Sequence, residues 1–125
     1  MHNSNAVKVV NIKEKLSLFS KHWNPKIVGE LNDHKVQVAK LKGEFVWHHH
    51  KKEDELFWVT KGHLVIHFRD RDIHINEGEF VIIPHLLEHK TEAPEEVEIV
   101  LIEPKGAVNT GNVETEKTVK KQDKI

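Results

Sequence analysis

The chain has 125 residues, which is one domain's worth and long enough to bury a core without metal or disulfide staples. A formal net charge of −1, with charged residues at 31%, leaves no basic surplus, which argues against a nucleic-acid or anionic-membrane partner. Cysteine is absent, which excludes disulfides and thiolate ligands. Without an apolar leader or a run long enough to cross a membrane, we expect a soluble, cytoplasmic protein.

Residues 1–25 are predicted to form an arm followed by a short helix. A short strand is expected over residues 7–10. Asn11 then offers a helix N-cap with Glu14 three residues on, so the apolar spacing predicts an amphipathic helix over residues 12–22. Pro25 ends it, because proline lacks the backbone donor and restricts the residue before it. We expect this helix to pack against the core and to carry no chemistry.

Residues 26–104 read as the main domain, because their apolar pattern has a period of two. Short strands with turn residues between them are typical of an all-β sandwich or barrel. The predicted strands cover residues 27–28, 36–41, 45–50, 56–60, 63–69, 72–75, 79–83 and 97–103. Residues 105–125 form a polar tail that we expect to be mobile beyond about residue 112.

Two expected hairpins assign the strand faces. If Lys61-Gly62 and Asp70-Arg71 are two-residue turns, one face is apolar and forms the barrel interior, with Glu55 at its rim. That face carries Phe57, Val59, Leu64, Ile66, Phe68, Ile73 and Ile75. The outer face carries Leu56, Trp58, Val65, His67 and His74.

Three histidines and one glutamate are candidates for a metal site. On an extended segment His48 and His50 share a face, while His49 takes the other. Glu55 points into an apolar interior, which is costly unless a cation neutralises it. His89 is the fourth candidate, and only a barrel or sandwich brings it near the others. The alternative is that residues 48–50 form a solvated loop patch, but the inward Glu55 favours the metal.

These residues also carry a resemblance to a known family. Gly43…His48-x-His50-x4-Glu55-x6-Gly62 resembles the first signature of the cupin superfamily, and Gly78-x5-Pro84-x4-His89 resembles the second. The match covers roughly residues 36–104. It implies a double-stranded β-helix, that is, a jelly-roll barrel, here with a short N-terminal helix. It also implies one divalent transition metal per chain (Mn, Fe, Ni, Co, Cu or Zn), held by His48, His50, Glu55 and His89.

Three neighbouring residues remain open as alternatives. The triple histidine permits a frame with His49, although only His48 shares a strand face with His50. Asp54 is an alternative carboxylate, although only Glu55 sets the six-residue gap to Gly62. His85 is expected in a loop at the barrel mouth or beside the substrate.

The function expected from this site is that of a metalloenzyme acting on a small polar molecule, with oxygenase- or isomerase-type chemistry. No second inward acid or base is evident in the pattern, which favours chemistry by the metal itself. The alternative is a non-catalytic cupin that binds or senses a small ligand and whose metal is structural. Phe45, Trp47 and Trp58 are predicted on the outer face, and the resemblance favours a homodimer that covers it.

Overall fold

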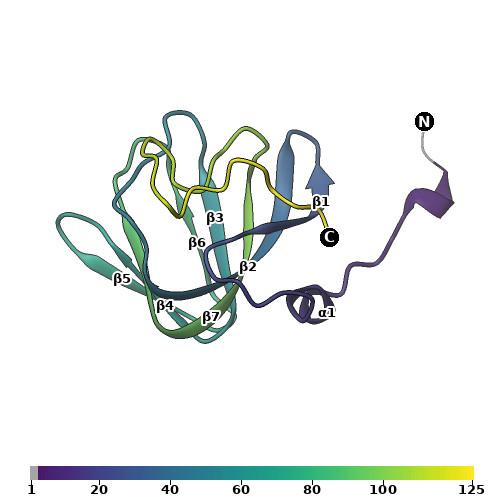
Figure 1. The fold of residues 1–125 in the computed structure, drawn as a ribbon, viewed down its shortest axis with the longest axis horizontal. Helices are drawn as coiled ribbons and strands as arrows, with labels where there is room; N and C mark the ends of the chain where they lie inside the picture. Colours follow the sequence, from purple (N-terminus) through teal and green to yellow (C-terminus); the bar gives the residue numbers. More distant parts are fainter. Residues whose placement is uncertain (1–2) are drawn as a thin grey trace.

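The computed structural model describes residues 3–125 and shows seven strands preceded by two short helical turns. Figure 1 shows the strands wrapped into a barrel, with the N-terminal arm extending away from it. The elements are η1 (Ser4–Ala6), α1 (Ile12–Leu16), β1 (Lys26–Leu31), β2 (His34–Glu44), β3 (Glu55–Lys61), β4 (His63–His67), β5 (Asp72–Asn76), β6 (Phe80–Ile83) and β7 (Lys90–Pro104). This all-β architecture with a short helix confirms the predicted fold class.

The long strand β7 joins the two halves of the barrel. Its first residues pair with β4, which in turn pairs with β5, and its later residues pair with β3, which pairs with β6. Strand β2 runs antiparallel along β7, and the strand order on the larger side is β1-β2-β7-β3-β6. Pairing shifts where Val97 lies opposite Leu41 but Ala93 lies opposite Gly43. This bulge at residues 94–96 bends β7 from one half to the other.

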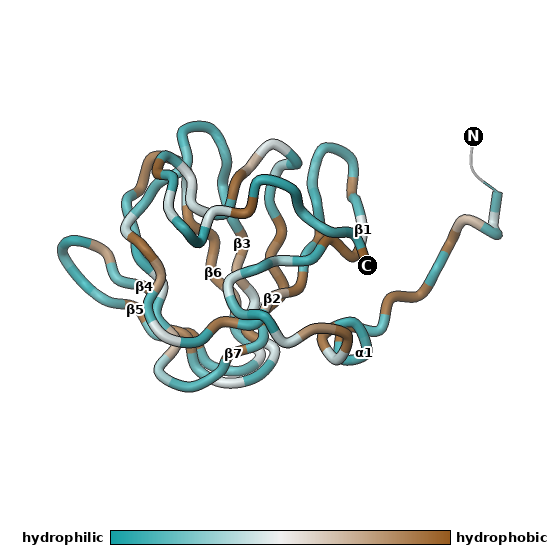
Figure 2. Tube along the Cα trace, in the orientation of Figure 1, coloured by the Kyte–Doolittle hydropathy of each residue, from teal (hydrophilic) through white to brown (hydrophobic). Residues whose placement is uncertain are grey.

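Apolar side chains fill the barrel and also part of its outer surface. Figure 2 shows hydrophobic stretches interspersed with hydrophilic ones along the strands, and hydrophilic colouring along most loops. The inner cluster is built from alternate residues of strands β2 to β7. A second cluster lies outside, where Leu16 of α1 packs with Val38 of β2 and Val100 of β7. The N-terminal helix therefore packs against the sheet, as expected.

The predicted hairpins are partly wrong, although the faces they assigned are right. Strands β3 and β4 do not pair with each other, because the chain turns at Gly62 from one half of the barrel to the other. The β4–β5 hairpin exists, but Ile66 lies opposite Ile73 instead of Ile75. This is an error of two residues, and side chains alternate with a period of two, so the inward set is unchanged.

Two N-terminal predictions are also wrong. Residues 7–10 form no strand, and α1 ends at Leu16 instead of residue 22. Asn11 does cap the helix, since its side chain accepts a hydrogen bond from the backbone N–H of Glu14. Beyond the helix, Trp23 lies against β2, because its backbone N–H donates to the Lys40 carbonyl and its ring N–H donates to the Lys42 carbonyl. These bonds replace the helical turns that the periodicity predicted.

The C-terminal segment, residues 105–125, lies against the barrel where we expected a mobile tail. Figure 1 shows it crossing one end of the barrel and ending beside β1. Thr110 is fully buried, and the backbone N–H of Ile125 donates to the carbonyl of Ile27. The polar composition suggested mobility, but these polar groups find partners both within the segment, such as Thr110 with Thr118, and on the barrel, such as Lys117 with the Glu44 carbonyl. The domain boundary at residue 105 stays a prediction.

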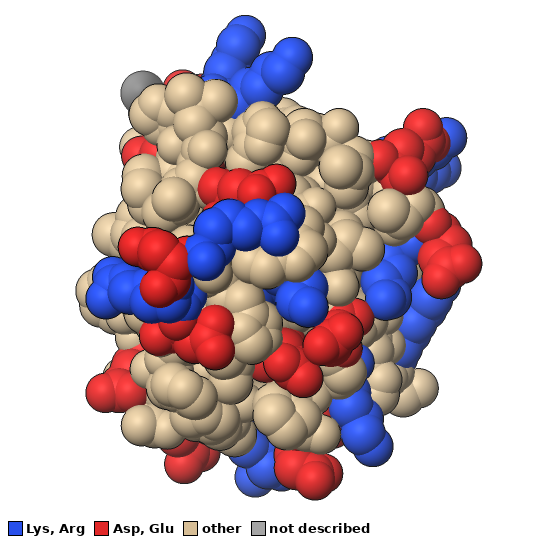
Figure 3. Space-filling model, turned by 90° about the vertical axis from the view of Figure 1, so that its left-hand side faces the viewer, with Lys and Arg blue, Asp and Glu red and all other residues tan. Residues whose placement is uncertain are grey.

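Charges of both signs are interspersed over the face drawn in Figure 3, with no broad region of one sign on that face. Within residues 3–125, no helix is both long and apolar enough to cross a membrane. The expectations of a cytoplasmic location and of no nucleic-acid partner stay predictions.

Candidate metal centre

The barrel brings the four predicted residues together from two distant segments. His48 and His50 lie in the connection between β2 and β3, Glu55 begins β3, and His89 immediately precedes β7. His48 and His89 form an isolated antiparallel bridge, in which each backbone N–H donates to the other's carbonyl at 3.0 and 2.9 Å. All four side chains are buried, at 3% exposure or less.

Backbone carbonyls set the protonation of two imidazoles. His48 Nδ1 lies 2.9 Å from the carbonyl oxygen of Val46, and His89 Nδ1 lies 2.8 Å from that of Leu87. A carbonyl only accepts, so each Nδ1 carries the hydrogen and each Nε2 keeps a free lone pair. This is the arrangement by which proteins orient histidine ligands toward a metal.

The remaining polar atoms converge without satisfying one another. Glu55 Oε1 lies 2.9 Å from His50 Nε2 and 3.4 Å from His89 Nε2, yet none of these three atoms has a hydrogen-bond partner. Their distances are short but their angles are not those of hydrogen bonds. Buried polar groups without partners are costly, and a cation that all of them face would satisfy them together. The donor set therefore fits a divalent transition metal.

Electrostatics at the site favour the metal-binding protonation states. Burial, reinforced by the imidazole of His89, lowers the pKa of His48 to about 4, so His48 is neutral near pH 7. Burial alone raises the pKa of a carboxyl, but the imidazoles of His50 and His89 outweigh it and hold the pKa of Glu55 well below its ordinary value. Neutral imidazoles and an ionised carboxylate are the forms that bind metal.

One further residue of the site escaped the sequence analysis. Glu103 of β7 is 1% exposed, and its ligand atom lies within 4.8 Å of those of His50 and Glu55. Burial, together with the Glu55 carboxylate, raises the pKa of Glu103 well above its ordinary value. The expectation of no second inward acid is therefore wrong.

A signal for Glu103 was present, because it has the same parity as Val97, Ile99 and Leu101, which all point inward. The alternation was hidden because Val100, which points outward, is also apolar and is buried under α1. Residues 99–102 are therefore apolar on both faces of the strand.

The three alternative residues lie outside the cluster. Asp54 is exposed and accepts hydrogen bonds from the ring and backbone of His85, which is also exposed. The backbone of His49 pairs with Asn112 of the C-terminal segment, and the His49 side chain is not among the groups that converge.

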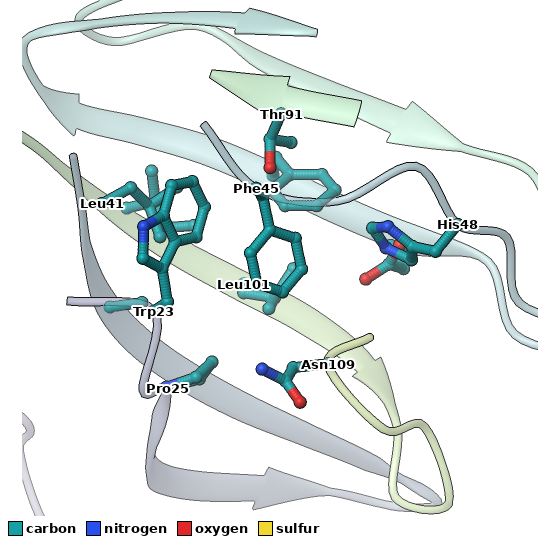
Figure 4. A pocket seen from close by; sticks show the side chains of 12 residues that line it. Trp23, Pro25, Leu41, Phe45, His48, Thr91, Leu101 and Asn109 are labelled. Atoms are coloured by element: carbon teal, nitrogen blue, oxygen red, sulfur yellow. The ribbon is translucent and has the colours of Figure 1, made fainter. Parts of the chain in front are cut away.

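A narrow cavity of about 30 Å³ lies beside His48 and Glu55. Figure 4 shows Trp23 and Phe45 with their rings close together on one side and Asn109 of the C-terminal segment on another. The cavity is lined mainly by apolar side chains: Trp23, Pro25, Ala39, Leu41, Phe45, Phe57, Ile99 and Leu101. Its volume is enough for about two water molecules.

The prediction that Phe45 lies on the outer face is wrong. It was expected opposite His48, but its ring stacks on Trp23 at 4.6 Å and meets the His48 ring edge-on at 5.5 Å. Residues 45–50 are not a regular strand, so strict alternation does not apply there.

The C-terminal segment also holds His48 and His50 in place. The Asn112 N–H donates to the His49 carbonyl at 3.0 Å, and the His49 N–H donates to Asn112 Oδ1 at 2.8 Å. Because both backbone groups of His49 are engaged, the neighbouring His48 and His50 are fixed relative to the barrel. Gly111 lies so close to this segment that a side chain there would overlap it.

Fold and site together define a β-barrel protein with a buried cluster of histidines and glutamates able to hold a metal. Residues 35–103 match the family described as Cupin_2, Cupin domain, which is more than half of the chain. The chain therefore belongs to the cupin family, and the barrel is the double-stranded β-helix that the two sequence motifs implied.

Three bacterial proteins are similar to this chain, and none of them is named for a reaction. An uncharacterized protein of Bacillus subtilis, YdbB, is 38% identical over 81 residues, which span 64% of this chain and 66% of the relative's length. A cupin-2 domain protein from Shewanella frigidimarina is 46% identical, with a TM-score of 0.77 over 78% of this chain and 95% of the other.

A double-stranded β-helix protein from Klebsiella pneumoniae is 19% identical, with a TM-score of 0.65 over 91% of this chain and 93% of the other. At this identity the likeness shows the fold alone.

Proposed function

We propose that the protein is a metal-dependent enzyme acting on a small molecule at one divalent transition metal held by His48, His50, Glu55 and His89. The observation that supports this most directly is the convergence of buried, unpartnered ring nitrogens and a carboxylate oxygen beside a cavity. A bound metal would polarise a substrate oxygen, or activate dioxygen if the metal is iron. Imidazole and carboxylate ligands suit Mn, Fe, Ni, Co, Cu or Zn.

The cavity lining supports a substrate with one polar end and an apolar body. A sugar needs several hydrogen-bonding groups, but the amide of Asn109 is already bonded to the backbone of Lys117 and Val119. Thr91 is the remaining polar residue of the lining besides His48 and Glu55. The lining therefore favours oxygenase-type chemistry over sugar isomerisation. Trp23, Phe45 and their apolar neighbours exclude water and orient the apolar body.

Metal content tests the first part of this proposal. The protein is purified without a nickel column, and the metal per chain is measured by elemental analysis. We expect one metal per chain in the wild type and in His49→Ala, whose side chain lies outside the cluster. We expect loss of the metal in His50→Ala and Glu55→Ala. Full metal occupancy in a variant that carries both substitutions would contradict the proposed site.

Turnover tests the second part. The metal-loaded protein is incubated with small phenols, 2-oxo acids and sugars, while oxygen uptake and products are followed. Oxygen consumption that depends on a phenol or an oxo acid supports the oxygenase reaction. Isomerised sugar without oxygen uptake would contradict it.

A second candidate is a non-catalytic cupin that binds or senses a small ligand, with a metal that is only structural. The burial of all four residues and the small cavity favour it, because a space for about two water molecules admits a larger molecule only if the residues lining it move. Azide added to the Co²⁺-loaded protein separates the two. A changed absorption spectrum indicates an open coordination position on the metal and supports the enzyme. An unchanged spectrum favours the non-catalytic protein with a structural metal.

We also propose a homodimer that covers the outer face of β3 and β6. Trp58 lies opposite Phe80 on these strands, and both are exposed, as is Ile82. Exposed apolar residues that adjoin one another in this way are typical of interaction surfaces.

A further inference from the structure

Glu103 occupies a defined position beside Glu55. Ile102 of β7 pairs with Leu56 of the antiparallel strand β3. Glu103 follows Ile102 and Glu55 precedes Leu56, so Glu103 and Glu55 are neighbours on adjacent strands. On its other side Glu103 pairs with Lys35 of β2. Lys35, Glu103 and Glu55 thus form one row across three strands, and all three side chains are buried.

The two oxygens of Glu103 have different surroundings. Oε1 accepts a hydrogen bond from Gln37 Nε2 at 3.1 Å and lies 3.8 Å from Lys35 Nζ. Oε2 is buried and has no hydrogen-bond partner. Gln37 and Lys35 therefore hold one edge of the carboxylate, and the other edge is left free.

Glu103 lies beside the buried histidines and Glu55 of the candidate metal site. The ligand atoms of His50, Glu55 and Glu103 lie within 4.8 Å of one another, and so do those of His48, Glu55 and His89. Glu55 belongs to both groups, so the groups adjoin at its carboxylate, but the five ligand atoms do not all lie within 4.8 Å of one another. Ligands of one metal at about 2.1 Å are separated by no more than about twice that distance, so one shared ion requires the side chains of the two groups to move closer together.

Two adjacent buried carboxylates are costly unless something compensates for them. Lys35 does so only in part, because its ammonium group donates to the Ala107 carbonyl at 2.7 Å and to Gln122 at 2.9 Å. A divalent cation between Glu55 and Glu103 compensates for both. We propose that Glu103 is a fifth protein ligand, binding through Oε2 the same metal as His48, His50, Glu55 and His89.

The fifth ligand limits what else the metal binds. A six-coordinate ion with five protein ligands keeps one exchangeable position, and the cavity beside His48 is where an outside molecule reaches it. Glu103 does not line this cavity, so it acts on the metal and not on a substrate.

The inference rests on the proposed metal centre, and its test uses Mn²⁺ with the full-length protein. Glu103→Gln keeps the shape and the bond from Gln37 but removes the carboxylate. Glu98→Gln is the matched control, because Glu98 lies on the same strand with opposite parity. Mn²⁺ affinity is measured by calorimetry, exchangeable water by proton relaxation, and metal-free stability by urea unfolding.

We expect Glu103→Gln to weaken Mn²⁺ binding more than about tenfold and to gain an exchangeable water, while Glu98→Gln matches the wild type. Metal-free stability should be equal or higher, because the carboxylate pair is relieved. Unchanged affinity and water in Glu103→Gln, with or without lost stability, would overturn the ligand role and leave the metal centre standing. Two Mn²⁺ per chain would overturn the single shared metal. A wild type that binds no metal defeats the proposed function itself.

Discussion

Gly111→Ala is expected to damage both stability and metal binding. Gly111 has a φ of +57°, and a Cβ there would overlap the His49 carbonyl oxygen and lie 3.0 Å from His48 Cδ2. The left-handed backbone costs alanine roughly 1 kcal/mol. The overlap involves backbone atoms, so no rotamer relieves it and the two segments must separate.

Separation also breaks the two hydrogen bonds between His49 and Asn112. Each contributes about 1 kcal/mol, so the total loss is about 3 kcal/mol. For a domain of this size we expect the melting temperature to fall by roughly 10 °C. Metal affinity should also fall, because the turn at Gly111 no longer orients His48.

Urea unfolding and Mn²⁺ calorimetry check both effects. Gly106→Ala is the matched control, because its Cβ would meet nothing within 4 Å and its φ is not in the left-handed region. If Gly111→Ala lies within about 0.5 kcal/mol of Gly106→Ala and binds Mn²⁺ equally well, the C-terminal segment does not hold the ligands and the reasoning is wrong.

Three further results are expected. The carboxylates of Glu92 and Asp72 raise the pKa of His67 above 6.5. Protonated His67 therefore stabilises the fold fully below about pH 6.5, and this stabilisation is lost as the pH rises through the raised pKa. Urea midpoints of the wild type and His67→Gln should therefore differ most at low pH, and a His67 NMR titration at or below 6.5 would contradict this. Phe80→Glu should convert a dimer to a monomer in light scattering, whereas a monomeric wild type would refute the dimer. Mn²⁺ at 100 times its dissociation constant should add about 2.7 kcal/mol of stability, an increase that a chelator reverses and that Glu55→Ala should not show.

Local sequence patterns predicted an all-β sandwich or barrel and the candidate site residues, and the resemblance to cupins specified the jelly-roll barrel and the set of four. The period of two assigned Glu55, Phe57 and Val59 to the interior, and the structure buries all three. The β4–β5 register was wrong by two residues without harm, since such a shift keeps every side chain on its face. The spacing of His48 and His50 relative to Glu55 and His89 identified four side chains that the structure does bring together. That they bind a metal is still a proposal.

Tertiary structure alone decided the rest. Which strands pair with β3 depends on partners far along the chain, and no local turn signal encodes that choice. Glu103 was hidden because both faces of β7 are buried, so its apolar run shows no alternation. The C-terminal segment looked mobile because its composition is polar, whereas in the structure its polar groups are bonded both to the barrel and within the segment. Local periodicity reports which way a side chain points, whereas contacts between distant segments decide what it meets there.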